Sequence, residues 1–136
     1  MSSTTNDIKI TILVVDDEPD ILLTISSVLS ERGHYVKTFD KAVIALEHLL
    51  SNTVQYDLII ADYRMPGGIS GLDMAKVIKK NARKSKVFLM TAFDISSFAE
   101  FAVALKSGLV DEVLRKPISN EKLISNIEKT FLHNNH

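Results

Sequence analysis

Polar side chains suited to acid, base or phosphate chemistry stand at the ends of four short apolar stretches of this chain. They are three carboxylates, one hydroxyl and one amine: Asp16, Asp17, Asp62, Thr91 and Lys116. Carboxylates gathered in one place repel one another, so some would hold protons well above their ordinary pKa. A hard divalent cation removes that conflict, and Mg2+ is the expected ion because it needs few protein ligands and shares its shell with phosphate.

The reaction that uses such a set of groups is phosphoryl transfer to a carboxylate. Asp62 is the expected nucleophile; it ends a buried apolar stretch, where a charged carboxylate is costly unless a positive group compensates it. Lys116 would neutralise charge on the phosphoryl oxygens, and Thr91 would donate a hydrogen bond to the new phosphoryl group. Asp16 and Asp17 would hold the metal. Each residue alone is also typical of a cap, a turn or a solvated strand end, so the prediction depends on all five meeting.

Alternating strands and helices would position these residues. Segments that are β-branched or apolar throughout indicate five strands, over 8–15, 35–39, 58–61, 86–91 and 112–114. Helical spacing and capping residues indicate five helices. The first begins at 18–20 and ends at Gly33, and the second covers 41–50 with Asp40 as its cap. The third begins at Ser70, the fourth runs from Ser96 or Ser97 to Gly108, and the fifth begins at Ser119.

The apolar stripes of these helices predict which side chains face the core. In the helix over 41–50 the expected inward residues are Val43, Leu46 and Leu50. In the helix that ends at Gly108 they are Phe98, Phe101, Ala102 and Leu105. Ser70 followed by Asp73 predicts a capping box at the start of the third helix.

Strands that alternate with helices and are largely apolar are typical of an α/β fold, an open parallel sheet with helices on both faces. Functional groups in such a sheet collect at the carboxyl ends of the strands, near the point where the strand order reverses. The five polar residues all follow strand ends, so the fold class itself predicts that they meet. No linker or repeat divides the chain, so we expect one domain over 8–132, a disordered tail over 1–7 and a frayed tail over 133–136.

The composition is that of an ordinary soluble domain, with 136 residues, 46% of them hydrophobic and 24% charged. A net charge of −1 argues against a nucleic-acid partner. We expect the basic run to be a solvated face; it consists of Lys76, Lys79, Lys80, Arg83, Lys84 and Lys86. The chain has no cysteine, which excludes thiolate chemistry. Its apolar stretches are far shorter than the about 20 residues of a membrane span, and its polar start is no signal peptide, which favours a cytoplasmic protein.

Four motifs, in order along the chain, resemble the receiver domain of two-component response regulators, of the single-domain chemotaxis type. They are Val14-Val15-Asp16-Asp17-Glu18-Pro19, Asp62-Tyr63-Arg64-Met65-Pro66, Met90-Thr91-Ala92 and Arg115-Lys116-Pro117. The resemblance covers nearly the whole chain, from Ile8 to Phe131. It implies a flavodoxin-like (βα)5 sandwich whose parallel five-stranded sheet has the order 2-1-3-4-5.

The resemblance also implies roles for individual residues. Asp62 would take its phosphoryl group from a phosphohistidine on a sensor histidine kinase or a histidine phosphotransfer protein. Asp17, Asp62 and the backbone carbonyl of Arg64 would bind Mg2+, with Asp16 acting through water. The peptide bond between Lys116 and Pro117 is expected to be cis.

A protein of this kind would be a switch and not a metabolic enzyme. It would catalyse only its own phosphorylation and dephosphorylation, and its product would be an altered surface formed by the last two helices and the strand between them. That surface would control a downstream protein or a homodimer, with no nucleic acid or membrane as partner. Because no output sequence follows Phe131, we expect a stand-alone receiver.

The sequence departs from the family pattern at one position of the expected switch. The family usually has Tyr or Phe three residues before the lysine, where this chain has Val113, so the usual aromatic route to the output surface is missing. The stretch over 67–71 is one residue longer than the common form and is expected to be a flexible lead into the next helix. Arg64 and Phe93 would flank the approach of a hydrolytic water and tune the lifetime of the phosphoryl group.

Two other functions compete with this interpretation. The first is a pseudo-receiver that acts as a constitutive protein-binding module, which Val113 alone supports. The second is a hydrolase with an aspartate nucleophile, which would need another Asp close after Asp62 as general acid. Tyr63-Arg64-Met65 offers none.

Overall fold

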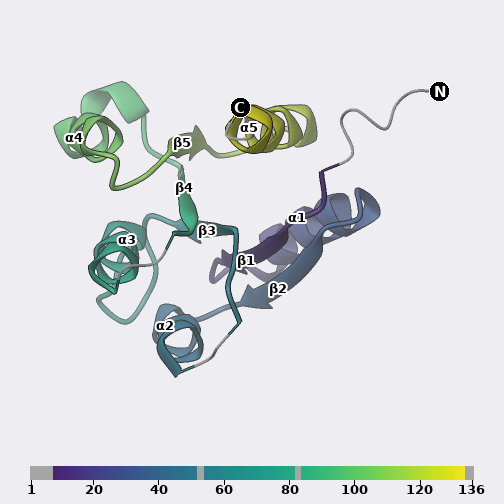
Figure 1. Cartoon of the computed structure of the whole chain (residues 1–136). Coiled ribbons are helices and arrows are strands. Elements are labelled where there is room, and N and C mark those ends of the chain that lie inside the picture. Colours follow the sequence, from purple (N-terminus) through teal and green to yellow (C-terminus); the bar gives the residue numbers. More distant parts are fainter. Residues whose placement is uncertain (1–7, 52–53, 82–83, 134–136) are drawn as a thin grey trace.

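A computed structural model of the chain describes residues 8–51, 54–81 and 84–133. Five strands and five helices alternate along it (Figure 1). The strands are β1 (Thr11–Val15), β2 (Tyr35–Phe39), β3 (Leu58–Asp62), β4 (Lys86–Thr91) and β5 (Glu112–Arg115). The helices are α1 (Pro19–Glu31), α2 (Ala42–Ser51), α3 (Gly71–Lys80), α4 (Ala99–Ser107) and α5 (Asn120–His133), with a short 3-10 turn, η2 (Ile95–Ser97), before α4.

All five strands belong to one parallel sheet of order β2-β1-β3-β4-β5, which confirms the predicted flavodoxin-like fold. The register aligns the strand ends. Val15 lies opposite Ala61, and Asp62 lies opposite Met90 on the other side. The carboxyl ends of β1, β3 and β4 therefore form one edge of the sheet, where the predicted site residues should be found.

Helices cover both faces of the sheet, with α2, α3 and α4 on one side and α1 and α5 on the other (Figure 1). Successive side chains of a strand point to opposite faces, so a strand covered on both sides is apolar throughout. In β3, Ile59 and Ala61 pack into one core cluster while Leu58 and Ile60 pack into the other. Every residue of β3 is buried, and this packing fixes the position of the strand that ends in Asp62.

Three predicted helix ends are confirmed, but the predicted start at Ser96 or Ser97 is wrong, because these residues belong to η2 and α4 begins at Ala99. Ser70 and Asp73 form a reciprocal capping box at the start of α3. The Ser119 hydroxyl accepts a hydrogen bond of 3.0 Å from the Lys122 amide at the start of α5. Gly108 ends α4 with a positive φ of 80°, a conformation that glycine adopts without strain. The predicted tail over 1–7 and residues 134–136 lie outside the described residues, and α5 reaches His133.

Several predicted core positions are wrong. Val43 and Leu50 of α2 are 44% and 51% exposed, and the residues that α2 buries are Ala42, Ala45, Leu46 and Leu49. This helix carries apolar side chains around most of its circumference, so periodicity could not select the inner stripe. In α4 the buried pair is Phe101 and Ala104, while Ala102 and Leu105 face solvent. The first strand also begins at Thr11 and not at residue 8.

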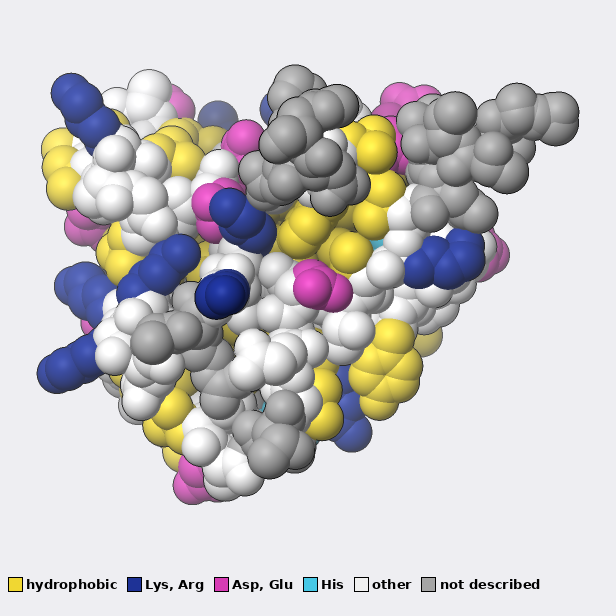
Figure 2. Space-filling view, viewed as in Figure 1, with side chains coloured by type: hydrophobic (Ala, Val, Ile, Leu, Met, Phe, Trp, Pro, Cys, Tyr) yellow, Lys and Arg dark blue, Asp and Glu magenta, His cyan; other side chains and the backbone are white. Residues whose placement is uncertain are grey.

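The described lysines of the basic run are exposed or half-buried, as expected for a solvated face; Arg83 lies outside the described residues. Basic side chains gather beside α3 in the space-filling view (Figure 2). Within the parts of the chain that the structure describes, no helix has the length and apolar character required to cross a lipid bilayer.

Candidate functional site

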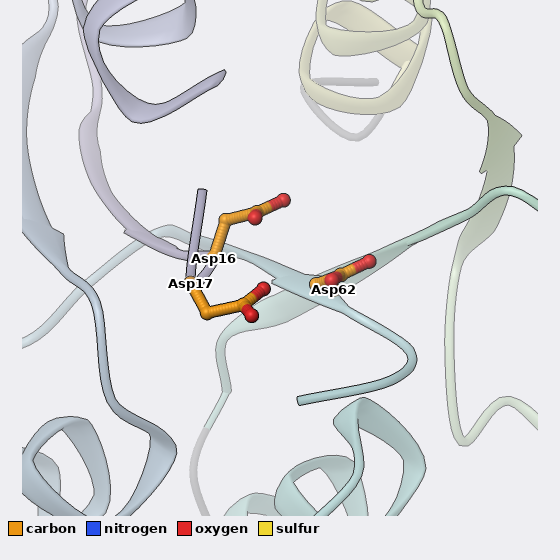
Figure 3. Close-up of side chains that lie close together, drawn as sticks. All are labelled: Asp16, Asp17 and Asp62. Atoms are coloured by element: carbon orange, nitrogen blue, oxygen red, sulfur yellow. The ribbon is translucent and has the colours of Figure 1, made fainter. Parts of the chain in front are cut away.

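Three aspartates meet at the carboxyl edge of the sheet, and we call Asp16, Asp17 and Asp62 the acidic cluster (Figure 3). Asp16 and Asp17 follow β1, and Asp62 is the last residue of β3. One carboxylate oxygen from each residue lies within 4.8 Å of the others. Asp16 and Asp62 are buried, and Asp17 is exposed. The convergence of these three residues, predicted from strand ends, is confirmed.

Asp16 is fully buried and links the end of β1 to the start of α1. Its Oδ1 accepts a hydrogen bond of 2.9 Å from the Glu18 amide, and its own amide donates to the Phe39 carbonyl at 3.1 Å. Its Oδ2 lies 2.8 Å from Lys116 Nζ, although among the described residues no donor is aligned for a hydrogen bond with it. The negative charge on Asp16 Oδ2 is therefore compensated by Lys116, while lone pairs on this oxygen are free to accept a further bond.

Lys116 supplies the positive charge of the site. Its Nζ lies 2.8 Å from Asp16 Oδ2, 3.2 Å from Asp62 Oδ1 and 3.7 Å from Glu18 Oε2. Its amide donates to the Thr91 carbonyl at 2.7 Å, and the following bond to Pro117 is cis, as predicted. Burial lowers the pKa of Lys116, but the carboxylates of Asp16 and Asp62 outweigh burial, and the net effect is a raised pKa. The ammonium group therefore stays charged between the two buried carboxylates.

Asp62 has a strongly perturbed acidity. Its pKa is raised to about 6, mainly by burial and then by the negative charge of Asp16, while Lys116 acts in the opposite direction. A carboxylate with this pKa is largely ionised near neutral pH, and Lys116 offsets only part of the electrostatic cost of its charge. That combination is typical of a functional group.

Thr91 ends β4, the strand that pairs with β3, and Arg64 follows Asp62 by two residues. Thr91 is buried at the end of β4, and its Oγ1 accepts a hydrogen bond of 3.0 Å from the Phe93 amide. The guanidinium of Arg64 lies 4.9 Å from the centre of the Phe93 ring, a cation–π contact. The predicted metal ligation by the Arg64 carbonyl stays a prediction.

The start of α3 packs directly on the end of β3. A Cβ atom on Gly71 would lie 2.6 Å from the Asp62 carbonyl oxygen, a distance at which real Cβ atoms are essentially never found. The Gly71 amide also donates to the Tyr63 carbonyl at 3.0 Å. We predicted that 67–71 is a flexible lead, but Gly71 is buried in α3, and its missing side chain lets the helix support the backbone of Asp62.

Four aromatic rings connect the end of β3 to α4, and we call Tyr63, Phe93, Phe98 and Phe101 the aromatic cluster. Tyr63 makes edge contacts with Phe101 and Phe93, at centroid distances of 4.8 Å and 6.1 Å. Phe98 stacks on Phe93 at 5.0 Å and contacts Phe101 at 5.5 Å. The Tyr63 hydroxyl donates a hydrogen bond to the Glu100 carboxylate in the first turn of α4.

Sequence reasoning missed this connection. It placed Phe98 and Phe101 in the core but gave no role to Tyr63 or Glu100, whose pairing joins residues 37 positions apart. The clustering of phenylalanines around the segment that follows Thr91 was the available signal. The contact of Glu18 with Lys116 was also unforeseen.

The acidic cluster fits a hard divalent cation. Its donors are carboxylate oxygens, which Mg2+ prefers, and they are close enough to share one ion. The buried Asp16 Oδ2, which has no aligned donor within the described part of the chain, also fits a site in which lone pairs face a cation or its bound water. The residues present are therefore consistent with Mg2+ binding.

Comparison with known proteins points to one family. The family described as "Response regulator receiver domain" matches residues 12–128. The DNA-binding transcriptional regulator NtrC of Escherichia coli is 32% identical over 120 residues, which cover 88% of this chain and 24% of that protein. The chain thus spans about a quarter of the length of this relative.

Solved structures agree with this match. A response regulator receiver domain protein from Clostridium thermocellum has 30% sequence identity and a TM-score of 0.80, with 93% of this chain and 97% of that chain covered. The response regulator protein TrrA from Thermotoga maritima, solved in complex with Mg2+ and BeF, has 35% identity and a TM-score of 0.71, with 88% and 96% covered.

Proposed function

The chain belongs to the response regulator receiver domain family, and from this premise we propose that Asp62 is its phosphoacceptor. Receiver domains of two-component systems are phosphorylated by histidine kinases. The observation that carries the assignment is the position of Lys116 Nζ, 3.2 Å from Asp62 Oδ1 and 2.8 Å from Asp16 Oδ2. A nucleophilic carboxylate, its counter-charge and an acidic pair thus meet at the carboxyl edge of the sheet.

The proposed reaction follows from these groups. A carboxylate oxygen of Asp62 attacks the phosphorus of a phosphohistidine, the new oxygen–phosphorus bond forms, and the phosphorus–nitrogen bond to the imidazole breaks. The leaving imidazole nitrogen takes up a proton. The nucleophile must be ionised, and a pKa of about 6 leaves Asp62 mostly ionised at neutral pH.

Positive charge beside the acceptor supports the transfer. Lys116 offsets negative charge on the phosphoryl oxygens, and the Thr91 hydroxyl can donate a hydrogen bond to the transferred group. Asp16, Asp17, Asp62 and the Arg64 carbonyl would hold Mg2+, with Asp16 acting through water. The ion, when bound, neutralises the charge that develops on the phosphoryl oxygens.

Phosphorylation would change the surface formed by α4, β5 and α5, and that surface would control a downstream protein or form a homodimer. Val113, which is buried in β5, occupies the position where the family usually has an aromatic residue. This surface therefore lacks that aromatic side chain. The chain would act as a cytoplasmic switch, not as a metabolic enzyme, with a sensor histidine kinase or a histidine phosphotransfer protein as phosphodonor.

Intact mass spectrometry tests the acceptor role. The purified protein is incubated with acetyl phosphate, with Mg2+ or with a chelator, next to the Asp62→Asn variant and the matched control Asp40→Asn. We expect one added phosphoryl group, only with Mg2+, in the parent and in the control, and none in Asp62→Asn. Mass gain in Asp62→Asn would refute the assignment. No gain in any protein, with acetyl phosphate and with a histidine kinase, would favour the constitutive binding module.

A further inference from the structure

We propose that Tyr63 and Glu100 are positioning residues that couple the acidic cluster to the first turn of α4. This inference rests on the proposed function, because it concerns the Mg2+ site of the same receiver. The juxtaposition that carries it is a hydrogen bond between the residue that follows Asp62 and a side chain of α4. It gives this chain a direct connection from its site to α4 that does not pass through Val113.

The backbone of Tyr63 is fixed on two sides. Its amide donates to the Met90 carbonyl at 2.7 Å, and its carbonyl accepts from the Gly71 amide at 3.0 Å. These bonds hold the end of β3 between β4 and the start of α3. Tyr63 stands between Asp62 and Arg64, which are two of the expected metal ligands, so whatever restrains Tyr63 also restrains them.

The side chain of Tyr63 adds a restraint that comes from α4. Its ring lies against Phe101, which is fully buried in α4, and against Phe93, which stacks on Phe98 just before that helix. Its hydroxyl donates to Glu100, one residue before Phe101. The first turn of α4 therefore holds Tyr63 through the ring and through the hydroxyl.

Arg64 is tied to the same group of residues. Its guanidinium lies over the Phe93 ring, and the Phe93 amide donates to the Thr91 hydroxyl. Tyr63 and Arg64 thus both rest on Phe93, and Phe93 in turn contacts the expected phosphate-sensing residue. The aromatic cluster joins the segments after Asp62 and after Thr91 to a single helical turn.

Coupling between two sites is reciprocal. If α4 restrains the Tyr63–Arg64 backbone, the backbone carbonyl of Arg64 is already ordered when the metal binds, and less ordering is needed. Metal binding must then stabilise the first turn of α4 to the same extent. Loss of the Tyr63–Glu100 hydrogen bond should therefore weaken Mg2+ binding and uncouple α4 from it.

The Tyr63→Phe variant tests this coupling, because it removes only the hydroxyl and keeps the ring in the aromatic cluster. Its matched control is Tyr35→Phe, a tyrosine that is 61% exposed at the amino end of β2, away from the acidic cluster. Mg2+ affinity is measured by isothermal titration calorimetry at fixed ionic strength. We expect Tyr63→Phe to bind Mg2+ about two- to fivefold more weakly, the low end for one net hydrogen bond because the pair is partly exposed.

A mutant cycle separates the hydrogen bond from the charge of Glu100. Glu100→Ala removes a negative charge as well as the acceptor, and Glu121→Ala, in the first turn of α5, controls for helix-terminal charge. In the double variant Tyr63→Phe/Glu100→Ala the two losses should not add, because both remove the same bond. Fully additive losses would overturn the proposal.

Amide hydrogen exchange of α4 supplies the second readout. In the parent and in Tyr35→Phe, saturating Mg2+ should slow exchange at residues 101–103, and this slowing should be smaller in Tyr63→Phe. A Tyr63→Phe variant that matches the control in both readouts, or that binds Mg2+ more tightly, would overturn the coupling and leave the proposed function intact. A parent that does not bind Mg2+ would overturn the proposed metal site and the coupling with it.

Discussion

Replacing Asp62 with asparagine should make the metal-free protein more stable at neutral pH, because the folded chain holds this carboxylate at an electrostatic cost. Its pKa is raised from 3.8 to about 6, mainly by burial. A carboxyl group whose pKa is raised in the folded state stabilises the fold below its unfolded pKa, and stability is lost as the pH rises through the folded pKa. The relevant window therefore runs from pH 3.8 to about 6.

The magnitude follows from the size of the shift. One pKa unit corresponds to about 1.4 kcal/mol, so the complete shift corresponds to about 3 kcal/mol above pH 7. At pH 5, where the folded carboxyl is still mostly protonated, the same linkage relation gives about 1.5 kcal/mol. Lys116 is already included, since its attraction is one of the causes that set this pKa.

Urea unfolding in the presence of a chelator provides the assay, at pH 5 and at pH 7.5. Asp62→Asn should be more stable than the parent, and its advantage should about double between the two pH values. Asp40→Asn, which changes an exposed carboxylate, should show no such widening. An advantage that does not grow with pH, or a variant that is less stable at pH 7.5, would refute the view that Asp62 is held charged at a cost.

Two substitutions test other parts of the site, and one titration tests His34, which lies just before the amino end of β2 and outside the acidic cluster. Lys116→Met should destabilise the protein by about 3 to 5 kcal/mol at pH 7.5, since it leaves buried carboxylates unpaired, and by less at pH 5, where Asp62 is protonated; urea unfolding measures both. Gly71→Ala should cost about 1 to 3 kcal/mol of stability in the same assay, because its Cβ would press on the Asp62 carbonyl. The pKa of His34 is lowered from 6.5 by burial and nearby positive charges, and its Nδ1 accepts a bond from the Ile10 amide. The stability that neutral His34 contributes should be lost as the pH falls below 6.5. NMR titration measures the pKa of His34. Unfolding in the Asp62→Asn background measures the stability without the opposing contribution of Asp62.

The acidic cluster could be predicted from sequence because the fold brings strand ends together. Asp16 and Asp17 follow the apolar strand β1 and Asp62 ends β3, and parallel strands in an α/β sheet present their carboxyl ends at one edge. No long-range detail was needed beyond the alternation of strands and helices. Lys116 could be predicted in the same way, because it also comes after a strand, and the structure places it between two of the aspartates.

Other features depend on packing that local patterns do not encode. The apolar pattern predicts Val43 and Leu50 in the core because α2 is apolar on most sides, but only the docking of the helix decides which stripe is covered. Gly71 resembled a flexible residue, although its role is to allow close contact between α3 and β3. The bond between Tyr63 and Glu100 joins distant segments, and no spacing rule relates such positions.

Chemical trapping identifies the residue that carries the phosphoryl group, which we propose is Asp62. The parent protein is phosphorylated with acetyl phosphate and Mg2+, reduced with borohydride, which converts an aspartyl phosphate to homoserine, and analysed by peptide mass spectrometry. We expect homoserine at position 62 and at no other aspartate. Homoserine at Asp16 or Asp17, or a phosphorylated protein in which Asp62 is recovered unchanged, would contradict it.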